Sequence, residues 1–401
     1  MRTHWNFFGA GRLVFGSGSI SQLGQLAARR KLARTLVVTD KNLVNAGVAT
    51  RILQSLEEAG IRCSVFDGGE AEPSLDTARR AITAAEEFRP DSIVGLGGGS
   101  NMDLAKIVAM LLAHGGAPAD YFGFDRIPGP VLPLICVPTT AGTGSEVSHS
   151  AVLTDTGKGV KVSTLSEYLR PAVAIVDPQL TLSCPPKATA DSGIDALTHA
   201  IEAYTAMDNA KLEVPDEQVT PYDGKTPMGD VLAEKAIALI GQNLETAVQE
   251  PDNLAARENM ALAATLAGLA FSNCGVSIVH ALEYPIGAAV HVSHGAGNGL
   301  LLPYVMRFNL GVRAREFARI AELLGANTKG LDESAAAEMA VRKVENLKQA
   351  IGIPERLREI GATEEMLPGF AEKSFAIKRL VQLNPRPPSE ADLLGILREA
   401  L

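Results

Sequence analysis

Short apolar runs alternate with amphipathic stretches through the first half of the chain, up to about Pro178. Stretches 42–59 and 74–88 carry helical spacing with charged outer faces. Around them lie five runs, rich in Val, Ile and Leu, that have the length of buried strands: Thr35–Val38, Cys63–Phe66, Ser92–Leu96, Leu134–Val137 and Ala172–Val176. Strands that alternate with helices in this way predict a doubly wound, parallel α/β sheet.

The strand signal fades from about Leu182, and long stretches rich in Ala, Leu and Glu follow. Five of them predict helices: Gly193–Ala206, Asp230–Gln249, Leu254–Phe271, Ala314–Leu324 and Ser334–Ala350. We therefore expect two domains, an α/β domain over residues 1–180 and an all-helical domain over residues 181–401. Met207–Gly229 interrupts the helices with polar residues and several prolines, and loops of this length are usually functional or mobile.

Composition excludes several classes of partner. The 401 residues carry a net charge of −9, so no basic surplus exists to neutralise the phosphates of a nucleic acid. No apolar run approaches the roughly 20 residues that span a bilayer, and the N-terminus lacks a basic region followed by an apolar core. The four cysteines are scattered without a CxxC pair. We expect a cytoplasmic protein with neither a nucleic-acid nor a membrane partner.

A glycine cluster follows the Ser92–Leu96 run and leads into a helical stretch that reaches about His114. Gly98 and Gly99 let the backbone approach a pyrophosphate closely, and a helix N-terminus supplies amide donors. Ser100 is expected to cap this helix. It also stands where a GxGxxG motif would have its third glycine, so the sequence departs from that motif. A flexible turn between strand and helix is the alternative.

Two other strand ends carry polar groups. The segment Pro138–Glu146 combines small hydroxyl residues with two glycines, which suits contacts to phosphate or ribose, although a plain polar loop is the alternative. Asp40 ends the first strand. An acidic residue in that position can hydrogen-bond a ribose 2′-OH and repel a 2′-phosphate, which favours NAD over NADP. A strand-end Asp is also a common helix cap.

Four residues of the second half have the chemistry of metal ligands. Asp195 and His199 lie four residues apart in a helical stretch, so both side chains leave the same face. His280 and His294 follow, in a chain with only seven histidines. One carboxylate and three imidazoles suit Fe²⁺ or Zn²⁺ and do not suit Ca²⁺ or Mg²⁺. A surface pair at Asp195 and His199, and a core histidine at His280, are the alternatives.

Together these motifs resemble the iron-containing (group III) alcohol dehydrogenases, which share a fold with glycerol dehydrogenase and dehydroquinate synthase. The resemblance covers nearly the whole chain and rests on segments in the same order: GGGSNMDLAK, PTTAGTGSEV, AIVDP, GIDALTHAIEAY, VHAL followed by SHG, and NPRPPSEADLLGILREAL. It implies a Rossmann-like domain that binds NAD(P) and an all-helical domain that binds Fe²⁺, with Zn²⁺ as the alternative metal. It also implies a homodimer or a higher homo-oligomer.

The resemblance assigns residues to each role. The metal ligands would be Asp195, His199, His280 and His294, and Phe271 would line the substrate pocket. The cofactor site would be formed by Asp40, Gly98, Gly99, Ser100, Asn101, Met102, Asp103, Thr139, Thr140, Thr143 and Lys161.

Tyr284 is the main departure from the family pattern, which places a second histidine four residues after the third metal ligand. In relatives that histidine lies beside the substrate and helps to pass the hydroxyl proton outward. A phenol, with an unperturbed pKa of about 10, is a poorer proton shuttle near neutrality. This tyrosine and the long Met207–Gly229 segment are similar to features of the hydroxyacid–oxoacid transhydrogenase branch.

The expected activity is hydride transfer between an alcohol and nicotinamide, with the metal polarising the substrate oxygen. The alternative is a transhydrogenase that oxidises 4-hydroxybutyrate while reducing a 2-oxo acid. A lyase like dehydroquinate synthase would need an array of basic residues that the acidic second half lacks. A non-catalytic metal-binding protein is disfavoured, because it would need no nicotinamide loop.

Overall fold

The computed structural model describes residues 2–157, 160–213 and 220–401, which form two compact units. One unit is Phe8–Cys184. The other joins the residues up to Phe7 to Pro185–Leu401. The N-terminal residues therefore group with the second half of the chain, a connection that no local pattern in the sequence indicates.

A six-stranded parallel sheet forms the centre of the first unit, with the strand order β1-β9-β6-β4-β2-β3. Its strands are β1 (Leu13–Phe15), β2 (Arg34–Val38), β3 (Arg62–Phe66), β4 (Ser92–Gly97), β6 (Leu134–Pro138) and β9 (Val173–Val176). All five predicted strands are present, and the doubly wound sheet is confirmed. The edge strand β1 was not predicted, because three residues carry too short a pattern.

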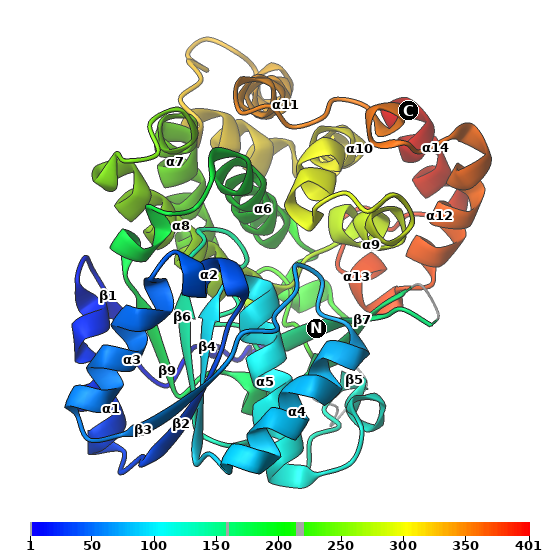
Figure 1. Ribbon diagram of the computed structural model, residues 1–401. Coiled ribbons are helices and arrows are strands. Elements are labelled where there is room, and N and C mark those ends of the chain that lie inside the picture. The colour runs from blue at the N-terminus through cyan, green and yellow to red at the C-terminus, as the bar shows by residue number, and fades with distance from the viewer. Residues whose placement is uncertain (1, 158–159, 214–219) are drawn as a thin grey trace. The chain divides into compact units, whose positions relative to one another are not determined.

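Helices cover both faces of this sheet (Figure 1). Helices α1 (Leu23–Arg29) and α3 (Val48–Glu58) pack with Val37, whereas α4 (Leu75–Phe88) and α5 (Gly99–His114) pack with Leu36 and Val38. Alternate residues of the inner strands β2, β4 and β6 thus enter opposite cores, which is why these strands read as continuous apolar runs.

The helix predicted over residues 42–59 is in fact two helices, α2 (Lys41–Asn45) and α3. Gly47 separates them with a φ of +73°, a conformation that glycine adopts at little cost. The helical pattern on either side continues through this position, so the periodicity alone could not reveal the break.

A second, smaller sheet has the order β5-β8-β7 and was not predicted. It consists of β5 (Gly123–Phe124), β7 (Ser150–Asp155) and β8 (Val160–Leu165), of which β7 and β8 are antiparallel. Polar residues such as Thr154, Asp155 and Lys161 interrupt its strands, so their apolar signal is weak. Short 3₁₀ helices connect the elements of this unit: η1 (Ser19–Gln22), η2 (Pro118–Tyr121), η3 (Glu167–Leu169) and η4 (Pro178–Thr181).

The second unit is built from helices, as predicted, and the described part of Pro185–Leu401 contains no strand. The α-helices are α6 (Pro186–Thr205), α7 (Pro227–Gln249), α8 (Leu254–Cys274), α9 (Ile278–Val290), α10 (His294–Leu323), α11 (Glu333–Ala350), α12 (Leu367–Phe375), α13 (Lys378–Val381) and α14 (Glu390–Ala400). The 3₁₀ helices are η5 (Asn209–Lys211), η6 (Leu357–Ile360) and η7 (Glu364–Met366).

Helix α6 is the centre of this unit, because it packs against α7, α8 and α10 and is buried along most of its length. Helix α10 begins at His294, twenty residues before the predicted start at Ala314, and it is kinked at Arg313. The guanidinium of Arg313 donates hydrogen bonds to the carbonyls of Thr205 and Ala206, so the kink is fixed to the end of α6.

The segment expected to be a loop, Met207–Gly229, is shorter than predicted, because α7 already begins at Pro227. Residues 214–219 of this segment lie outside the described residues. The carboxylate of Asp223 accepts hydrogen bonds from the side chain of Arg2, at 2.6 Å, and from the backbone N–H of Asn6, at 2.9 Å. These contacts explain why the N-terminal residues group with the helical unit.

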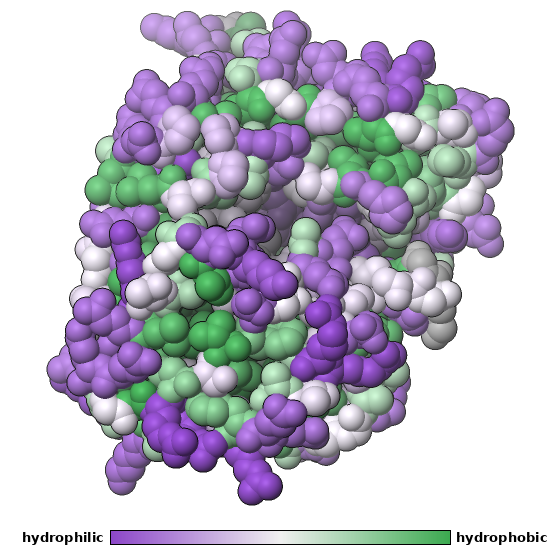
Figure 2. All heavy atoms as spheres, viewed as in Figure 1, coloured by the Kyte–Doolittle hydropathy of each residue, from purple (hydrophilic) through white to green (hydrophobic). Residues whose placement is uncertain are grey.

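On the face shown in Figure 2, hydrophilic residues cover much of the surface and apolar residues gather in separate patches. Within the described ranges, no single helix has the length and apolar composition needed to cross a membrane. The pair α8 and α9 passes on length and composition together, with a bend of 104° between the two helices.

Candidate functional site

Three of the four predicted metal ligands lie together in the helical unit. Asp195 comes from the middle of α6, His280 from the first turn of α9, and His294 is the first residue of α10. One ligand atom from each residue lies within 4.8 Å of the other two. The Oδ1 atom of Asp195 is 3.8 Å from Nε2 of His280 and 4.0 Å from Nε2 of His294. This is the geometry of a group that can close on one ion.

His199 lies beside this group on the next turn of α6. Its Nδ1 atom is 3.9 Å from Oδ2 of Asp195, and its ring stacks on His280 with 4.8 Å between ring centroids. Phe271, from α8, stacks on the same histidine at 4.2 Å. The structure therefore places Phe271 beside His199, where its ring supplies an apolar wall.

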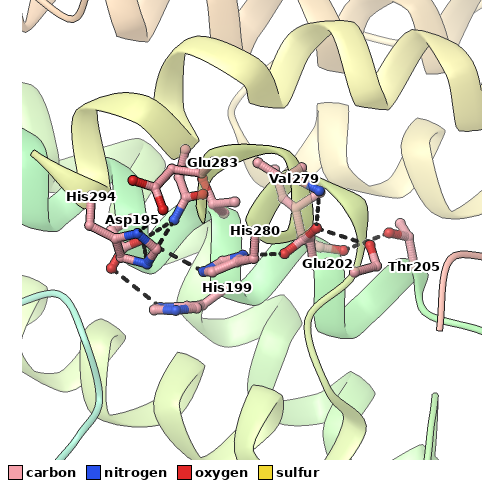
Figure 3. A network of polar contacts seen from close by, with 12 residues as sticks. Asp195, His199, Glu202, Thr205, Val279, His280, Glu283 and His294 are labelled. Carbon is pink, nitrogen blue, oxygen red and sulfur yellow. Dashed lines mark hydrogen bonds and ion pairs between the residues drawn. The ribbon is translucent and has the colours of Figure 1, made fainter. Parts of the chain in front are cut away.

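Two buried glutamates contact the histidine rings at the nitrogens that do not face Asp195 (Figure 3). Nδ1 of His280 lies 2.5 Å from Oε2 of Glu202, and Nδ1 of His294 lies 2.5 Å from Oε2 of Glu283. Because a carboxylate accepts the Nδ1 hydrogen, the Nε2 lone pair of each ring is left to face Asp195.

Asn298 completes the polar surroundings from α10, one turn after His294. Its amide Nδ2 donates to Oδ1 of Asp195 at 2.8 Å and lies 3.2 Å from Nε2 of His294. Asn298 is fully buried, so its amide holds the carboxylate and the imidazole at a fixed separation.

The electrostatics favour an ionised carboxylate and a neutral imidazole. Burial by itself raises the pKa of Asp195, but the nearby His199, His294 and His280 outweigh it and lower the pKa to about 2. The pKa of His199 falls to about 4, mainly because its ring is buried. His280 and His294 also lower this pKa, whereas Asp195 raises it. A neutral histidine keeps a lone pair for a metal at neutral pH.

Buried nitrogen atoms without partners test whether these residues fit a metal ion. Nδ1 of His199 and Nε2 of His280 find no hydrogen-bond partner among the described residues. Buried polar atoms are nearly always paired, so each exception needs a reason. A cation bonded to these two nitrogens would be such a reason. One carboxylate with imidazoles is a set of ligands that binds Fe²⁺ or Zn²⁺.

Tyr284 lies on α9, one turn after His280. Its ring centroid is 5.9 Å from that of His294, with an angle of 39° between the rings. The residue is thus next to a predicted metal ligand, in the position where the family pattern has its second histidine.

The cofactor residues belong to the α/β unit, where β4 and β6 are neighbours in the sheet. Gly98 and Gly99 follow β4, and a Cβ atom added to Gly99 would lie only 2.7 Å from the side chain of Thr143. Thr140 is 3.7 Å from the corresponding position of Gly98, and the N–H of Thr139 donates to Gly97. The two polar strand ends therefore form one surface, as expected for adjacent parallel strands.

Ser100 does not cap α5, contrary to the sequence prediction. The N-cap is Gly98, which offers no side chain, and the hydroxyl of Ser100 donates to the carbonyl of Ala71. A helix that begins at a glycine leaves its first N–H groups free of a side-chain cap, as a phosphate-binding helix requires.

Asp40 is the N-cap of α2, which was the alternative interpretation of this residue. Its Oδ1 atom accepts from the N–H groups of Asn42 and Leu43, at 2.8 and 3.1 Å. Asn101 donates to its Oδ2 atom at 2.7 Å. Asn101 therefore holds Asp40 at the end of β2, beside the glycine cluster.

Three other residues assigned to the cofactor have internal positions or partners. Met102 is fully buried in the core between the sheet and α4 and α5. Asp103 accepts hydrogen bonds from the hydroxyl of Ser145 and from the N–H of Val152. Lys161 lies in β8, and its Nζ is 3.1 Å from the carboxylate of Glu72.

Glu202, Glu283 and Asn298 were missed by reasoning from the sequence. Glu202 follows Asp195 by seven residues and His199 by three, so helical spacing places all three on one face and could have revealed it. Asn298 follows His294 by four residues in the same way. Glu283 follows His280 by three residues, so helical spacing also placed it near a ligand, but its partner His294 belongs to another helix and spacing could not reveal that contact.

Comparison with known proteins finds the same family in both halves of the chain. The family model described as iron-containing alcohol dehydrogenase matches residues 10–178, and that of the C-terminal region of the Fe-containing alcohol dehydrogenase family matches residues 218–401. The chain is 35% identical over 396 residues to the NAD-dependent methanol dehydrogenase of Bacillus methanolicus, covering 99% of this chain and 100% of that protein.

Two further relatives agree with these matches. The 1,3-propanediol dehydrogenase of Citrobacter freundii is 39% identical over 388 residues, with 96% of each chain covered. A crystal structure of a 1,3-propanediol oxidoreductase matches all of both chains with a TM-score of 0.93 and 37% identity. As the sequence motifs predicted, the chain belongs to the iron-containing alcohol dehydrogenase family and is a metal-dependent oxidoreductase of alcohols.

Proposed function

We propose that the chain oxidises small primary alcohols or diols, and reduces the corresponding aldehydes, with Fe²⁺ and NAD. The observation that carries this proposal is the approach of Asp195, His280 and His294 to within 4.8 Å of one another. The relatives named for methanol and 1,3-propanediol support the substrate class, and the relative described as NAD-dependent supports NAD rather than NADP.

The metal ligands in this proposal are Asp195, His199, His280 and His294. Fe²⁺, or Zn²⁺ in its place, would supply a Lewis acid that polarises the substrate oxygen. These side chains would offer one carboxylate, from Asp195, and three imidazoles to the ion. Asn298 fixes the orientation of that carboxylate through its hydrogen bond of 2.8 Å.

The cofactor would bind where the glycine cluster meets the threonine loop of the α/β unit. The uncapped N-terminus of α5 offers backbone N–H groups to a pyrophosphate, and Gly98, Thr140 and Thr143 lie beside it. Asp40 has a carboxylate already bonded to three donors, and a carboxylate has about four lone-pair sites, so one is left for a ribose hydroxyl.

Two residues would shape the reaction next to the metal. Phe271 stacks on His199, so its ring would exclude water from that side and favour an apolar substrate chain. Tyr284 lies beside His294, where its hydroxyl would hold a hydrogen bond as the alcohol proton leaves.

Domain roles, assembly and location belong to the same proposal. We assign cofactor binding to the unit Phe8–Cys184 and the metal site to the unit that joins the residues up to Phe7 to Pro185–Leu401, in a homodimer or a higher homo-oligomer. All four cysteines are free thiols, which supports a cytoplasmic location. Neither the methanol dehydrogenase nor the 1,3-propanediol dehydrogenase is named as a transhydrogenase.

The test is to purify the protein without oxygen, load it separately with Fe²⁺ and Zn²⁺, and follow NADH absorbance. The substrates are methanol, longer alcohols, diols, and 4-hydroxybutyrate with and without 2-oxoglutarate. Formation of NADH from simple alcohols or diols, lost in His280→Ala and kept in Glu234→Gln, is the expected result. Oxidation of 4-hydroxybutyrate that requires the oxo acid would replace the proposal by the transhydrogenase.

A further inference from the structure

The two glutamates that hold the histidines have no role in the proposed chemistry, and they carry an inference that rests on the proposed metal site. Each is almost completely buried, with 2% of Glu202 and 0% of Glu283 exposed. One carboxylate oxygen of each accepts a hydrogen bond from the Nδ1 atom of a histidine. Burying a carboxylate destabilises the folded state unless the carboxylate is well paired, so the fold requires these contacts.

Glu202 fixes more than a single ring. Its Oε1 atom accepts from the hydroxyl of Ser277, at 2.9 Å, and from the N–H of Val279, at 2.8 Å, while Oε2 accepts from His280. Ser277 is the N-cap of α9 and makes no side-chain capping bond of its own. Glu202, from α6, therefore caps α9 and orients the histidine in its first turn at the same time.

Glu283 connects α9 to α10. It follows His280 by three residues on α9 and reaches His294 at the start of α10. Gly297 leaves room for this side chain, since a Cβ atom there would lie 2.8 Å from Cγ of Glu283. The close approach thus depends on a glycine, and any larger residue would displace the glutamate.

The two pairs have the same chemical consequence. An imidazole that donates its Nδ1 hydrogen keeps the lone pair on Nε2, and both Nε2 atoms lie about 4 Å from Oδ1 of Asp195, at 3.8 and 4.0 Å. Carboxylates in this position raise the basicity of a metal-bound histidine and stop its ring from turning. We propose that Glu202 and Glu283 are positioning residues that present His280 and His294 to the metal through Nε2.

The two histidines differ in exposure, so loss of each glutamate is expected to have a different effect. The side chain of His280 is 2% exposed, whereas that of His294 is 33% exposed. His280 is held by packing as well as by Glu202, but His294 has solvent on one side and depends more on its glutamate. Loss of Glu283 should therefore weaken metal binding and accelerate metal release, with little change in the fold without metal.

A purely structural role makes a different prediction. If these glutamates only satisfy buried donors, their removal lowers the stability of the metal-free protein and leaves the intrinsic affinity for metal unchanged. Glu283 distinguishes the two roles best, because Glu202 also caps a helix and its loss affects both quantities.

The experiment uses the full-length, metal-free protein and Zn²⁺ in competition with a chromophoric chelator. The variants are Glu283→Ala, Glu283→Gln, Glu202→Gln and His294→Ala, with Glu234→Gln as the matched control. Glu234 lies in the same unit and bonds the hydroxyl of Tyr204 on α6, so its substitution removes a comparable charge away from the metal. Thermal unfolding of each metal-free variant measures the structural effect separately.

Glu283→Ala should weaken Zn²⁺ binding by roughly 10–100-fold and speed its release, with an unfolding temperature close to that of the unmodified protein. Glu283→Gln keeps an oxygen that can accept from Nδ1, so it should lose less. In ¹⁵N spectra of the metal-free protein, the ring of His294 should be protonated on Nδ1, and Glu283→Ala should lose that preference.

Two results would overturn the proposal in distinguishable ways. If Glu283→Ala binds Zn²⁺ within twofold of the unmodified protein while His294→Ala binds it weakly, the metal site stands and Glu283 has no positioning role. If His294→Ala also binds Zn²⁺ normally, the metal site itself is assigned wrongly, and the positioning role falls with it.

Discussion

The Nζ atom of Lys106 lies 2.8 Å from the Oγ atom of Ser145, 39 residues further along the chain. Lys106 has no exposed surface, and its ammonium also donates to the hydroxyl of Ser148 and to the carbonyl of Ser150. Asp103, one turn earlier on α5, accepts from the same Ser145. This buried cluster ties the helix that follows the glycine cluster to the loop that carries the threonines.

Lys106→Met should therefore destabilise the α/β unit and weaken NAD binding together. The substitution leaves Asp103 without its buried cation, and loss of one partner of a buried pair costs about 3 kcal/mol or more. Urea unfolding followed by circular dichroism measures the first effect, and the KM for NAD measures the second. Ser148→Ala, which removes one hydrogen bond, should cost only about 1 kcal/mol. A wild-type unfolding midpoint for Lys106→Met would refute this role.

Gly295→Ala should weaken the contact between the helices that carry the metal ligands. A Cβ atom at this position would lie 2.0 Å from the carbonyl oxygen of Asp191 and 3.1 Å from Cβ of Asp195, so α10 would have to move away from α6. Overpacking of this kind costs about 1–3 kcal/mol. Thermal unfolding and bound metal per chain should both decrease.

Gly311→Ala in the same helix is the matched control. Nothing lies within 4 Å of a Cβ atom there, and an exposed helical glycine replaced by alanine gains about 0.5–1 kcal/mol. Equal effects of the two substitutions would show that the approach of α10 to α6 is not limiting at Gly295.

Lys348→Met should stabilise the protein at neutral pH, and the advantage should shrink as the pH rises. Burial lowers the pKa of Lys348 from 10.5 to about 8, although Glu355, Glu345 and Glu359 act in the opposite direction. Below about pH 8 the lysine is charged in both states, and the folded state bears the cost of burying the charge. Between about pH 8 and 10.5 the unfolded chain binds more protons, so the stability of the unmodified protein increases with pH.

The measurement is the difference in unfolding free energy between Lys348→Met and the unmodified protein at a series of pH values. At pH 7 the variant should be more stable by on the order of 2 kcal/mol, and by pH 10 the difference should be nearly gone. Cys63, whose pKa is raised to about 11 by burial and by Glu57, titrates in a similar range, but it contributes equally to both proteins and cancels in the difference. A difference independent of pH would contradict the assignment.

Tyr284→His and Tyr284→Phe should separate proton transfer from packing. The phenylalanine keeps the ring beside His294 but lacks the hydroxyl, so kcat should fall by roughly 100-fold if that hydroxyl passes the proton. The histidine should restore activity and add a titration near pH 6.5 to the kcat profile. Unchanged kcat in Tyr284→Phe would place the proton route elsewhere.

Local patterns sufficed for the parts of this protein in which neighbours along the chain decide the structure. The five apolar runs predicted five strands of the sheet, because inner strands that are covered on both faces must be apolar throughout. The edge strand β3 kept enough apolar residues to be predicted with them, although its Val65 is exposed. The spacing of Asp195 and His199 placed them on one face of α6, and the order of the motifs indicated the family. The edge strand β1 and the antiparallel strands β7 and β8 were not predicted, since their patterns are short or partly polar.

Only the tertiary structure decided which residues from separate elements meet. Sequence spacing gives no distance between Glu283 on α9 and His294 on α10, or between Lys106 and Ser145, because these contacts depend on how the elements pack. Packing also decided the role of Ser100, whose hydroxyl donates to the carbonyl of Ala71, while Gly98 is the N-cap of α5. The sequence determined the chemistry available and the faces that carry it, whereas packing determined which buried polar groups find partners, since each must be paired wherever the fold places it.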